Sequence, residues 1–278
     1  MASSLSHIRS HSLPTGSHPT ISNIEQILNK FKSIESSTTP SALAISNGLC
    51  RLVELYNSMD DLLNLPQTLQ ALSNYQNVKL VDELLDCPVK FLDICGFTRD
   101  IVSQVKENVR DLQSSLRRRK GDLSIESSIT KHTSFRKKMK KDAKKHISIL
   151  KKMDQAIESS ILGVDQDVSY VIRVLREINT MSISVLQLVL IFLTASKKKS
   201  SKWSISRTLN KGRVACEGQQ ACLNELETVD DALCKKSSTL HQDLGKLETS
   251  IEVIERGLEG ISRCLIRSRT SLLNIVSC

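Results

Sequence analysis

The sequence predicts an all-α protein: an elongated multi-helix bundle of about six to eight helices, with a coiled-coil-like C-terminal helix and a disordered N-terminal tail. The main observation is a run of eight apolar residues near the C-terminus, spaced alternately by four and three residues. Kept over about four heptads, this spacing marks a packing seam along one side of a helix. With 10 Gly and 5 Pro in 278 residues, long helices meet few interruptions. The seam residues are Leu240, Leu244, Leu247, Ile251, Ile254, Leu258, Ile261 and Leu265.

Residues 1–20 are rich in Ser, His and Pro and show almost no apolar spacing, so we expect a disordered tail. The tail contains the segment Arg9-Ser10-His11-Ser12-Leu13-Pro14. Phosphorylation of Ser12 would create the Arg-Ser-x-phosphoSer-x-Pro pattern that arginine clusters of the 14-3-3 type bind. Ser12 is therefore a candidate phosphosite with a 14-3-3-type reader as a candidate partner; a passive tail is the alternative, because Ser-rich segments produce such motifs by chance.

Apolar periodicity and prolines predict four helices between residues 21 and 117. Pro40 separates the first helix from a second one, which Ser41 caps. Pro66 opens the third helix and Pro88 opens a long fourth helix, because Pro is favoured in the first turn. The fourth helix ends in a basic turn followed by Gly121, a common C-terminal pattern.

A basic helix follows at about 122–162. Its apolar side would carry residues such as Met139 and Leu150, and its outer face would carry Arg136 and a series of lysines. Between Arg110 and Lys152 there are 15 Lys and Arg against 4 Asp and Glu, a local charge of +11 in a chain of net charge +9. The rest of the chain is therefore nearly neutral, and an electrostatic partner should bind this region.

Six lysines on this face are candidate contacts to an anionic surface. An anionic membrane is one candidate partner, and residues 137–141 also suit a nuclear-import patch. Nucleic acid is disfavoured because Phe135 is the only aromatic residue in the region, which leaves no platform for base stacking. A solvated helix face is the alternative to all three. The six residues are Lys137, Lys138, Lys140, Lys141, Lys144 and Lys145.

The segment 178–196 contains no charged residue and is followed by Lys197–Lys199 and Trp203. Its length of 19 residues is borderline for crossing a bilayer. Polar residues in its first half favour a buried bundle helix over a membrane span. A loop at 197–212 then leads to helical stretches at about 213–238 and 240–272. We expect 21–276 to form a single helical-bundle domain.

No motif for catalysis, a cofactor or a metal is present, so we expect a protein that is not an enzyme and has no cofactor. The eight cysteines form no C-x-x-C pair. His132 is isolated from the other histidines and from the cysteines. Adjacent carboxylates such as Asp230-Asp231 point in different directions on a helix, which suggests surface charge.

The positions flanking the seam carry acids such as Glu248 and Glu255 but no matching cations. A self-paired parallel zipper normally has complementary charges at these positions, so the seam should pack within the chain. The uncharged 178–196 helix is its expected neighbour.

Six blocks of sequence occur in order along the chain. They are the Arg9–Pro14 motif, Leu62-Leu63-x-Leu65-Pro66-Gln67-Thr68, Leu84-Leu85-Asp86, Phe91-Leu92-Asp93-Ile94-Cys95-Gly96 with Arg99-Asp100, Leu116-Arg117-Arg118-Arg119 and Leu265-Ile266-Arg267-x-Arg269-x-x-Leu272-Leu273-Asn274-Ile275. With these blocks the chain resembles a plant-specific family of uncharacterised helical proteins related to the BYPASS group. The resemblance implies a plant protein without established enzymatic activity and, for the BYPASS relatives, a role in root and shoot development through control of a mobile signal.

We therefore expect a non-catalytic regulatory or scaffolding protein of plant development that acts through protein–protein contacts. The alternative is a membrane-associated protein that uses segment 178–196 or the basic helix on anionic lipid. Since the N-terminus has no secretory apolar region, we expect a cytoplasmic protein, with membrane association and nuclear entry left open.

Overall fold

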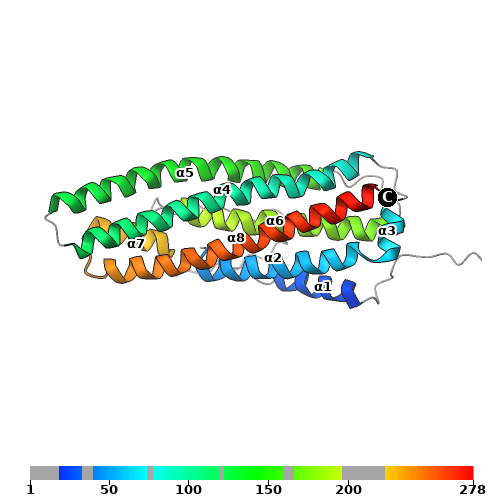
Figure 1. The fold of residues 1–278 in the computed structure, drawn as a ribbon, viewed down its shortest axis with the longest axis horizontal. Helices are drawn as coiled ribbons and strands as arrows, with labels where there is room; N and C mark the ends of the chain where they lie inside the picture. Colours follow the sequence, from blue (N-terminus) through cyan, green and yellow to red (C-terminus); the bar gives the residue numbers. More distant parts are fainter. Residues whose placement is uncertain are drawn as a thin grey trace, which may run out of the picture.

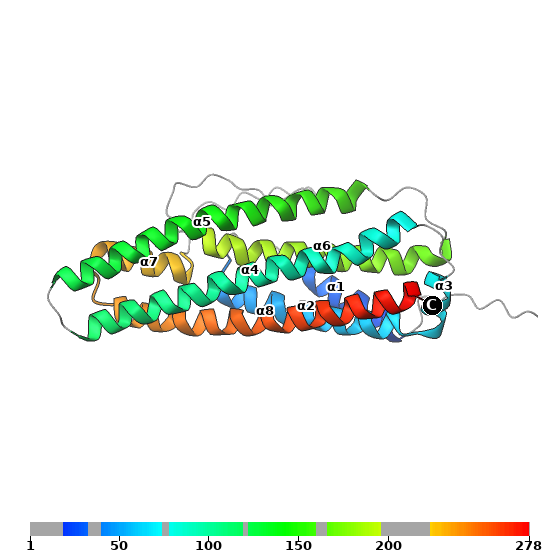
Figure 2. The same ribbon diagram turned by 45° about the horizontal axis from the view of Figure 1, so that its top comes forward.

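The computed structural model describes residues 19–32, 40–73, 78–118, 122–159, 166–195 and 223–277. Its long helices run along one axis and form an elongated bundle (Figures 1 and 2). These residues contain helices and no strand, which confirms the predicted fold class. The helices are α1 (Pro19–Lys32), α2 (Ala42–Leu63), α3 (Pro66–Ser73), α4 (Val78–Arg117), α5 (Asp122–Ser159), α6 (Gln166–Thr194), α7 (Glu225–Lys235) and α8 (Leu240–Ser277).

The seam of α8 is buried along its whole length, from Leu240 to Leu265. It packs chiefly on α4 and α2. Helix α6, the expected neighbour, instead packs on α5, α2 and α4, so that prediction was wrong. A seam of Leu and Ile fits any aliphatic stripe of matching shape, and for this reason its periodicity does not identify its partner.

Two cations of α4 pair with the acids that flank the seam. Lys106 Nζ lies 3.1 Å from Glu255 Oε2 and 3.2 Å from Glu252 Oε1. Arg110 Nε lies 2.8 Å from Glu248 Oε1. The missing cations are thus supplied by another helix of the same chain, and the predicted packing of the seam within the chain is confirmed.

Ser41 caps α2 as predicted, since its Oγ accepts a hydrogen bond of 3.2 Å from the Ala44 N–H. The predicted break at Pro88 was wrong, because α4 begins at Val78 and contains this proline. A proline inside a helix removes one backbone donor, at a cost of about 3 kcal/mol. The buried stripe of α4 from Phe91 to Leu112, which packs on α8, offsets that cost. Helix α1 begins at Pro19, inside the expected tail.

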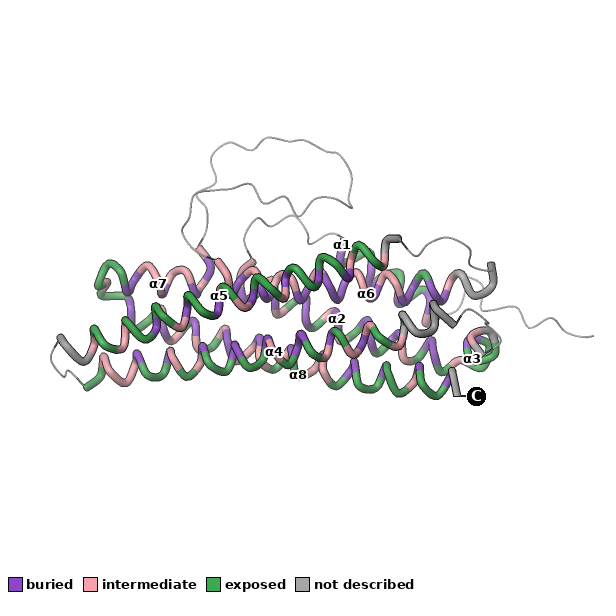
Figure 3. The backbone as a smooth tube through the Cα atoms, turned by 90° about the horizontal axis from the view of Figure 1, so that it is seen from above, coloured by how far each residue is buried: buried purple, intermediate pink, exposed green. Residues whose placement is uncertain are grey.

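Helix α6 lies among its neighbours as a bundle helix (Figure 3). The segment Tyr170–Thr194 is long and apolar enough to cross a membrane, with a mean hydropathy of 1.6, but 61% of its most apolar window is buried in the bundle. One polar residue in its first half is bonded within the bundle: the Ser182 hydroxyl lies 2.9 Å from the Tyr56 hydroxyl of α2. The core helix of a soluble protein has these same properties.

Candidate functional site

The outer face of α5 carries the six lysines predicted as anion contacts, which we call the α5 lysine face: Lys137, Lys138, Lys140, Lys141, Lys144 and Lys145. The opposite side of α5, including Met139 and Leu150, is buried against α6 and α4. All six lysines except Lys140 are exposed. Because the apolar side of α5 is buried in the bundle, the lysines on its opposite side point toward solvent.

Four of the six lysines make no ion pair with any residue that the structure describes: Lys137, Lys138, Lys141 and Lys144. Lys145 pairs with Asp142 one turn earlier, at 3.3 Å, on the surface. Lys140 is turned toward α7, and its Nζ lies 3.8 Å from Asp230 Oδ2. Burial, together with the neighbouring Arg136, lowers the pKa of Lys140.

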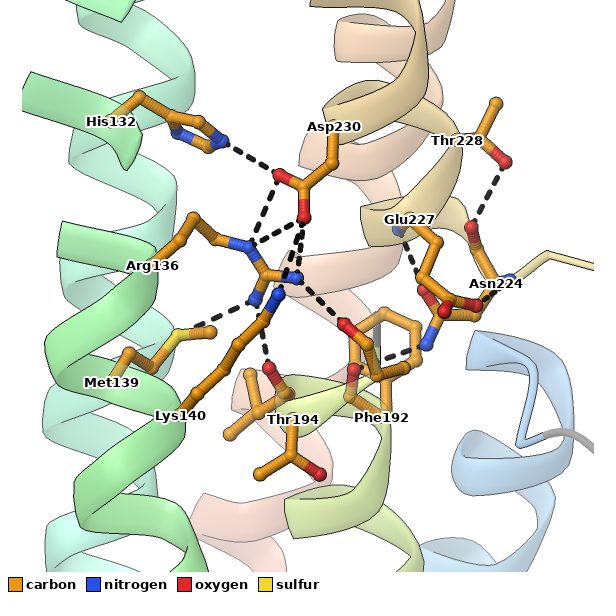
Figure 4. Close-up of polar contacts among 12 residues, drawn as sticks. His132, Arg136, Met139, Lys140, Phe192, Thr194, Asn224, Glu227, Thr228 and Asp230 are labelled. Atoms are coloured by element: carbon orange, nitrogen blue, oxygen red, sulfur yellow. Dashed lines mark hydrogen bonds and ion pairs between the residues drawn. The ribbon is translucent and has the colours of Figure 1, made fainter. Parts of the chain in front are cut away.

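Arg136, which the sequence placed on the outer face of α5, is instead buried, with 4% of its side chain exposed (Figure 4). Its Nη2 lies 2.8 Å from Asp230 Oδ2, and its Nε lies 3.0 Å from the same oxygen. The guanidinium also donates to the Leu193 carbonyl at 2.8 Å and to the Ala195 carbonyl at 3.2 Å. These carbonyls end α6, so Arg136 both neutralises Asp230 and caps a helix. Helical spacing places Arg136 on the same side of α5 as the buried Met139, three residues later, so the expected outer position of this arginine was wrong.

Asp230, whose side chain is 28% exposed, is the centre of a partly buried charge cluster that we call the Asp230 junction, formed by His132, Arg136, Lys140 and Asp230. His132 Nε2 lies 3.0 Å from Asp230 Oδ1, although the two residues are 98 positions apart in the chain. Since a carboxylate accepts hydrogen bonds, Nε2 carries the proton. Burial alone would raise the pKa of Asp230, but the hydrogen bonds from His132 and Arg136 outweigh burial and hold this pKa below its ordinary value. The prediction that Asp230 is a surface charge was therefore wrong.

Two residues at the start of α7 complete the contact between helices. Asn224 caps α7 through its side chain and, by its Nδ2, donates to the Phe192 carbonyl of α6 at 3.0 Å (Figure 4). The Glu225 carboxylate accepts from the Ala42 N–H at 3.2 Å and so satisfies the first turn of α2. The polar groups of α7 thus join the end of α6 to the start of α2.

The chemistry of the Asp230 junction is that of helix attachment. Both carboxylate oxygens of Asp230 accept hydrogen bonds from His132 and Arg136. Among the described residues, no three His, Cys, Asp or Glu side chains are grouped to hold a metal. The four-residue spacing of His132, Arg136 and Lys140 and the Asn224-x-x-Glu227 capping pattern are the sequence signals that could have located this junction. Ser12 lies outside the described residues and stays a predicted phosphosite, and the loop at 197–212 is likewise outside them.

The Asp230 junction predicts a loss of stability in acid. A carboxyl whose pKa is depressed in the folded protein contributes stability above its unfolded pKa of about 3.9, and this contribution is lost as the pH falls through the folded pKa. In Asp230→Asn, the free energy of unfolding should therefore change less below about pH 4 than in the parent protein. Urea titrations over this pH range measure the difference; parallel curves would contradict an ionised Asp230.

The fold and the site define a helical-bundle protein in which partly buried charges join helices and four lysines of the outer α5 face make no ion pair with the described residues. The family model described as Protein BPS1 matches residues 48–275, which include both the lysine face and the junction, so the chain belongs to this family. The resemblance to the BYPASS-related plant proteins is thereby confirmed. Membership implies a plant developmental regulator whose mechanism is unknown. Comparisons with curated proteins and with solved structures found no match.

Proposed function

We propose that this protein is a non-catalytic regulator of root and shoot development that acts by binding other proteins through exposed faces of its helices. Its family supports the regulatory role. The binding role rests on one observation in the last turns of α8. There Ile266 and Leu273 are 57% and 42% exposed, although the same helix buries every residue of its seam.

Ile266 and Leu273 lie seven residues apart, with the exposed Arg269 between them, and we call these three residues the α8 contact face. Seven residues of helix place the two aliphatic side chains on one side, about 10 Å apart. Single exposed apolar residues are common on protein surfaces. Two of them on one side of a helix beside an arginine form an apolar patch, and the cores of protein interfaces are more apolar than the rest of the surface and enriched in arginine.

The double variant Ile266→Glu/Leu273→Glu tests this face. Plants that lack the protein should recover root and shoot growth with the parent chain, and should recover it poorly with this variant. For a partner identified with the parent chain, the Kd should rise at least about tenfold. Both side chains are exposed, so circular dichroism and thermal unfolding should remain close to those of the parent.

Leu43→Glu is the matched control, because Leu43 is 70% exposed but lies at the opposite end of the sequence, in α2. It should restore growth fully. Complete recovery by the α8 double variant at normal abundance would contradict the proposal.

The second candidate function is membrane attachment through segment 178–196, which the apolarity of α6 favours. Insertion would require α6 to leave α5, α2 and α4, which cover it in the bundle. Carbonate extraction of a membrane fraction tests this candidate. Retention in the pellet would support a span, and release of all the protein into the supernatant would contradict it.

A further inference from the structure

We propose that the α5 lysine face binds the anionic head groups of a membrane surface, so that the bundle lies with α5 against the bilayer. This inference goes beyond the proposed function because it adds a lipid partner at a face separate from the α8 contact face. It also differs from a membrane span, because no helix leaves the bundle.

The first support is the amount of positive charge that the fold leaves without a partner. Lys137, Lys138, Lys141 and Lys144 are exposed and make no ion pair with the described residues. By contrast, cations elsewhere serve the fold: Arg136 neutralises Asp230, and Lys106 neutralises acids of α8. The four lysines therefore keep their charge available for an external anion.

The second support is the shape of the charged surface. The exposed lysines from Lys137 to Lys152 lie on one side of α5, over about 22 Å of helix. Helix α5 lies along one edge of the elongated bundle, so this stripe follows the long axis of the molecule (Figure 1). An extended stripe of charge fits an extended anionic surface. Five side chains of the lysine face also line an open hollow of about 580 Å³, where head groups can approach: Lys137, Lys140, Lys141, Lys144 and Lys145.

The third support is the kind of side chain on the stripe. The exposed cations of the stripe are all lysines, and the one arginine of this segment, Arg136, is buried. Lysine acts as a flexible point charge, whereas arginine gives the planar two-bond recognition of a defined phosphate or carboxylate. The stripe therefore suits a diffuse anionic surface better than a specific phosphopeptide.

Ile149 distinguishes lipid from nucleic acid as that surface. It is 45% exposed and lies four residues after Lys145 and three before Lys152, at the margin of the stripe. Lysine stems and an aliphatic side chain are both stabilised in the interfacial layer of a bilayer. An exposed isoleucine gains nothing from a phosphate backbone in water, and no exposed aromatic residue between 137 and 152 could stack on a base.

The test is sedimentation of the full chain with vesicles. The protein should bind phosphatidylcholine vesicles that contain phosphatidylserine and should not bind phosphatidylcholine alone. Binding should fall steeply between about 0.1 M and 1 M salt, since the screening length drops from about 10 Å to about 3 Å. Equal binding to neutral vesicles would overturn the proposal.

Charge reversal of Lys137, Lys138, Lys141 and Lys144 to Glu should weaken binding to the anionic vesicles at least about a hundredfold, because each basic residue near such a surface contributes a factor of about five. Replacement of the same four by Arg should preserve binding, and replacement by Gln gives a second test if charge reversal disturbs folding. Undiminished binding by the Glu or Gln variant would overturn the proposal.

A matched control makes the same change in net charge on the outer side of α8, by replacing four arginines with Glu. It should retain most of the binding if the position of the charge matters, and a loss equal to that of the α5 variant would overturn the assignment to α5. Since Arg269 belongs to the α8 contact face, the control is used with vesicles only. They are Arg256, Arg263, Arg267 and Arg269.

Competing anions provide the last arm of the test. Ile149→Gln should weaken vesicle binding about three- to tenfold and leave any binding to duplex DNA unchanged. Tighter binding to duplex DNA or to polyglutamate than to anionic vesicles at equal salt would overturn the lipid assignment. Failure of vesicle binding would leave the complementation result for the α8 contact face untouched, so the two proposals fail separately.

Discussion

Replacement of Asp230 by Leu is expected to lower the free energy of unfolding by about 3–5 kcal/mol, because it leaves the buried guanidinium of Arg136 without its counter-ion. His132 loses its hydrogen bond at the same time, and Nδ1 of the same ring has no hydrogen-bond partner among the residues that the structure describes. An unpaired buried charge costs far more than the pair itself contributes. Urea denaturation followed by circular dichroism measures the change.

The companion double variant Arg136→Met/Asp230→Leu separates the cost of leaving Arg136 unpaired from the cost of losing the other hydrogen bonds of Arg136. It removes both charges, so much of the lost stability should return. Recovery should stop short of the parent value, by about 1 kcal/mol for each helix-end carbonyl that Arg136 no longer caps, at Leu193 and Ala195.

The surface pair between Lys145 and Asp142 is the control for the Asp230 junction. Lys145→Met should change stability by less than about 1 kcal/mol, because exposed ion pairs contribute little. If Asp230→Leu had an effect as small as this control, the junction would not hold α7 to α5.

Gly257→Ala is expected to destabilise the protein by about 1–3 kcal/mol, although alanine is the better helix former. A Cβ atom at this position would lie 2.7 Å from Leu49 Cδ1 and 3.0 Å from Leu49 Cβ. The Cδ1 atom can rotate away, but the Cβ atom is attached to the backbone of α2. Relief therefore requires α2 and α8 to separate, which loosens one of the main contacts of the seam.

Gly245→Ala provides a control of opposite sign in the same helix. Nothing lies within 4 Å of a Cβ atom there, so the helix propensity of alanine should raise the free energy of unfolding by up to about 1 kcal/mol. Leu49→Ala alone should cost about 2–5 kcal/mol, and the double variant with Gly257→Ala should cost less than the sum of the two. Stabilisation by Gly257→Ala would show that the two helices do not approach closely at this residue.

The helices themselves were predictable because their signals are local. The spacing of the α8 seam, the Ser41 cap and the amphipathic pattern of the basic helix each depend on residues within a few turns. The break at Pro88 was the exception: the rule for proline is also local, but packing of the following stripe on α8 outweighed it.

The α5 lysine face was largely predictable and the Asp230 junction was not. Four of the six predicted lysines are exposed without a partner among the described residues, because helical periodicity opposite an apolar stripe determines the outward side. By the helical repeat, His132 and Arg136 lie on the same buried side of α5 as Met139, but the charge of Arg136 suggested the outer face. Their environment depends on α7, whose Asp230 is more than 90 positions away in the chain.

The local sequence of each segment was sufficient to predict the fold class, the buried side of each long helix and the region of positive charge. The reason is that an α-helix repeats every 3.6 residues whatever surrounds it. The choice of neighbours required the tertiary structure. Helix α8 packs on α2 where Gly257 admits Leu49, and on α4 where Lys106 and Arg110 meet its acids. Each of these contacts needs complementary shape or charge on two helices that are far apart in the chain. The sequence of one helix therefore does not identify its neighbour.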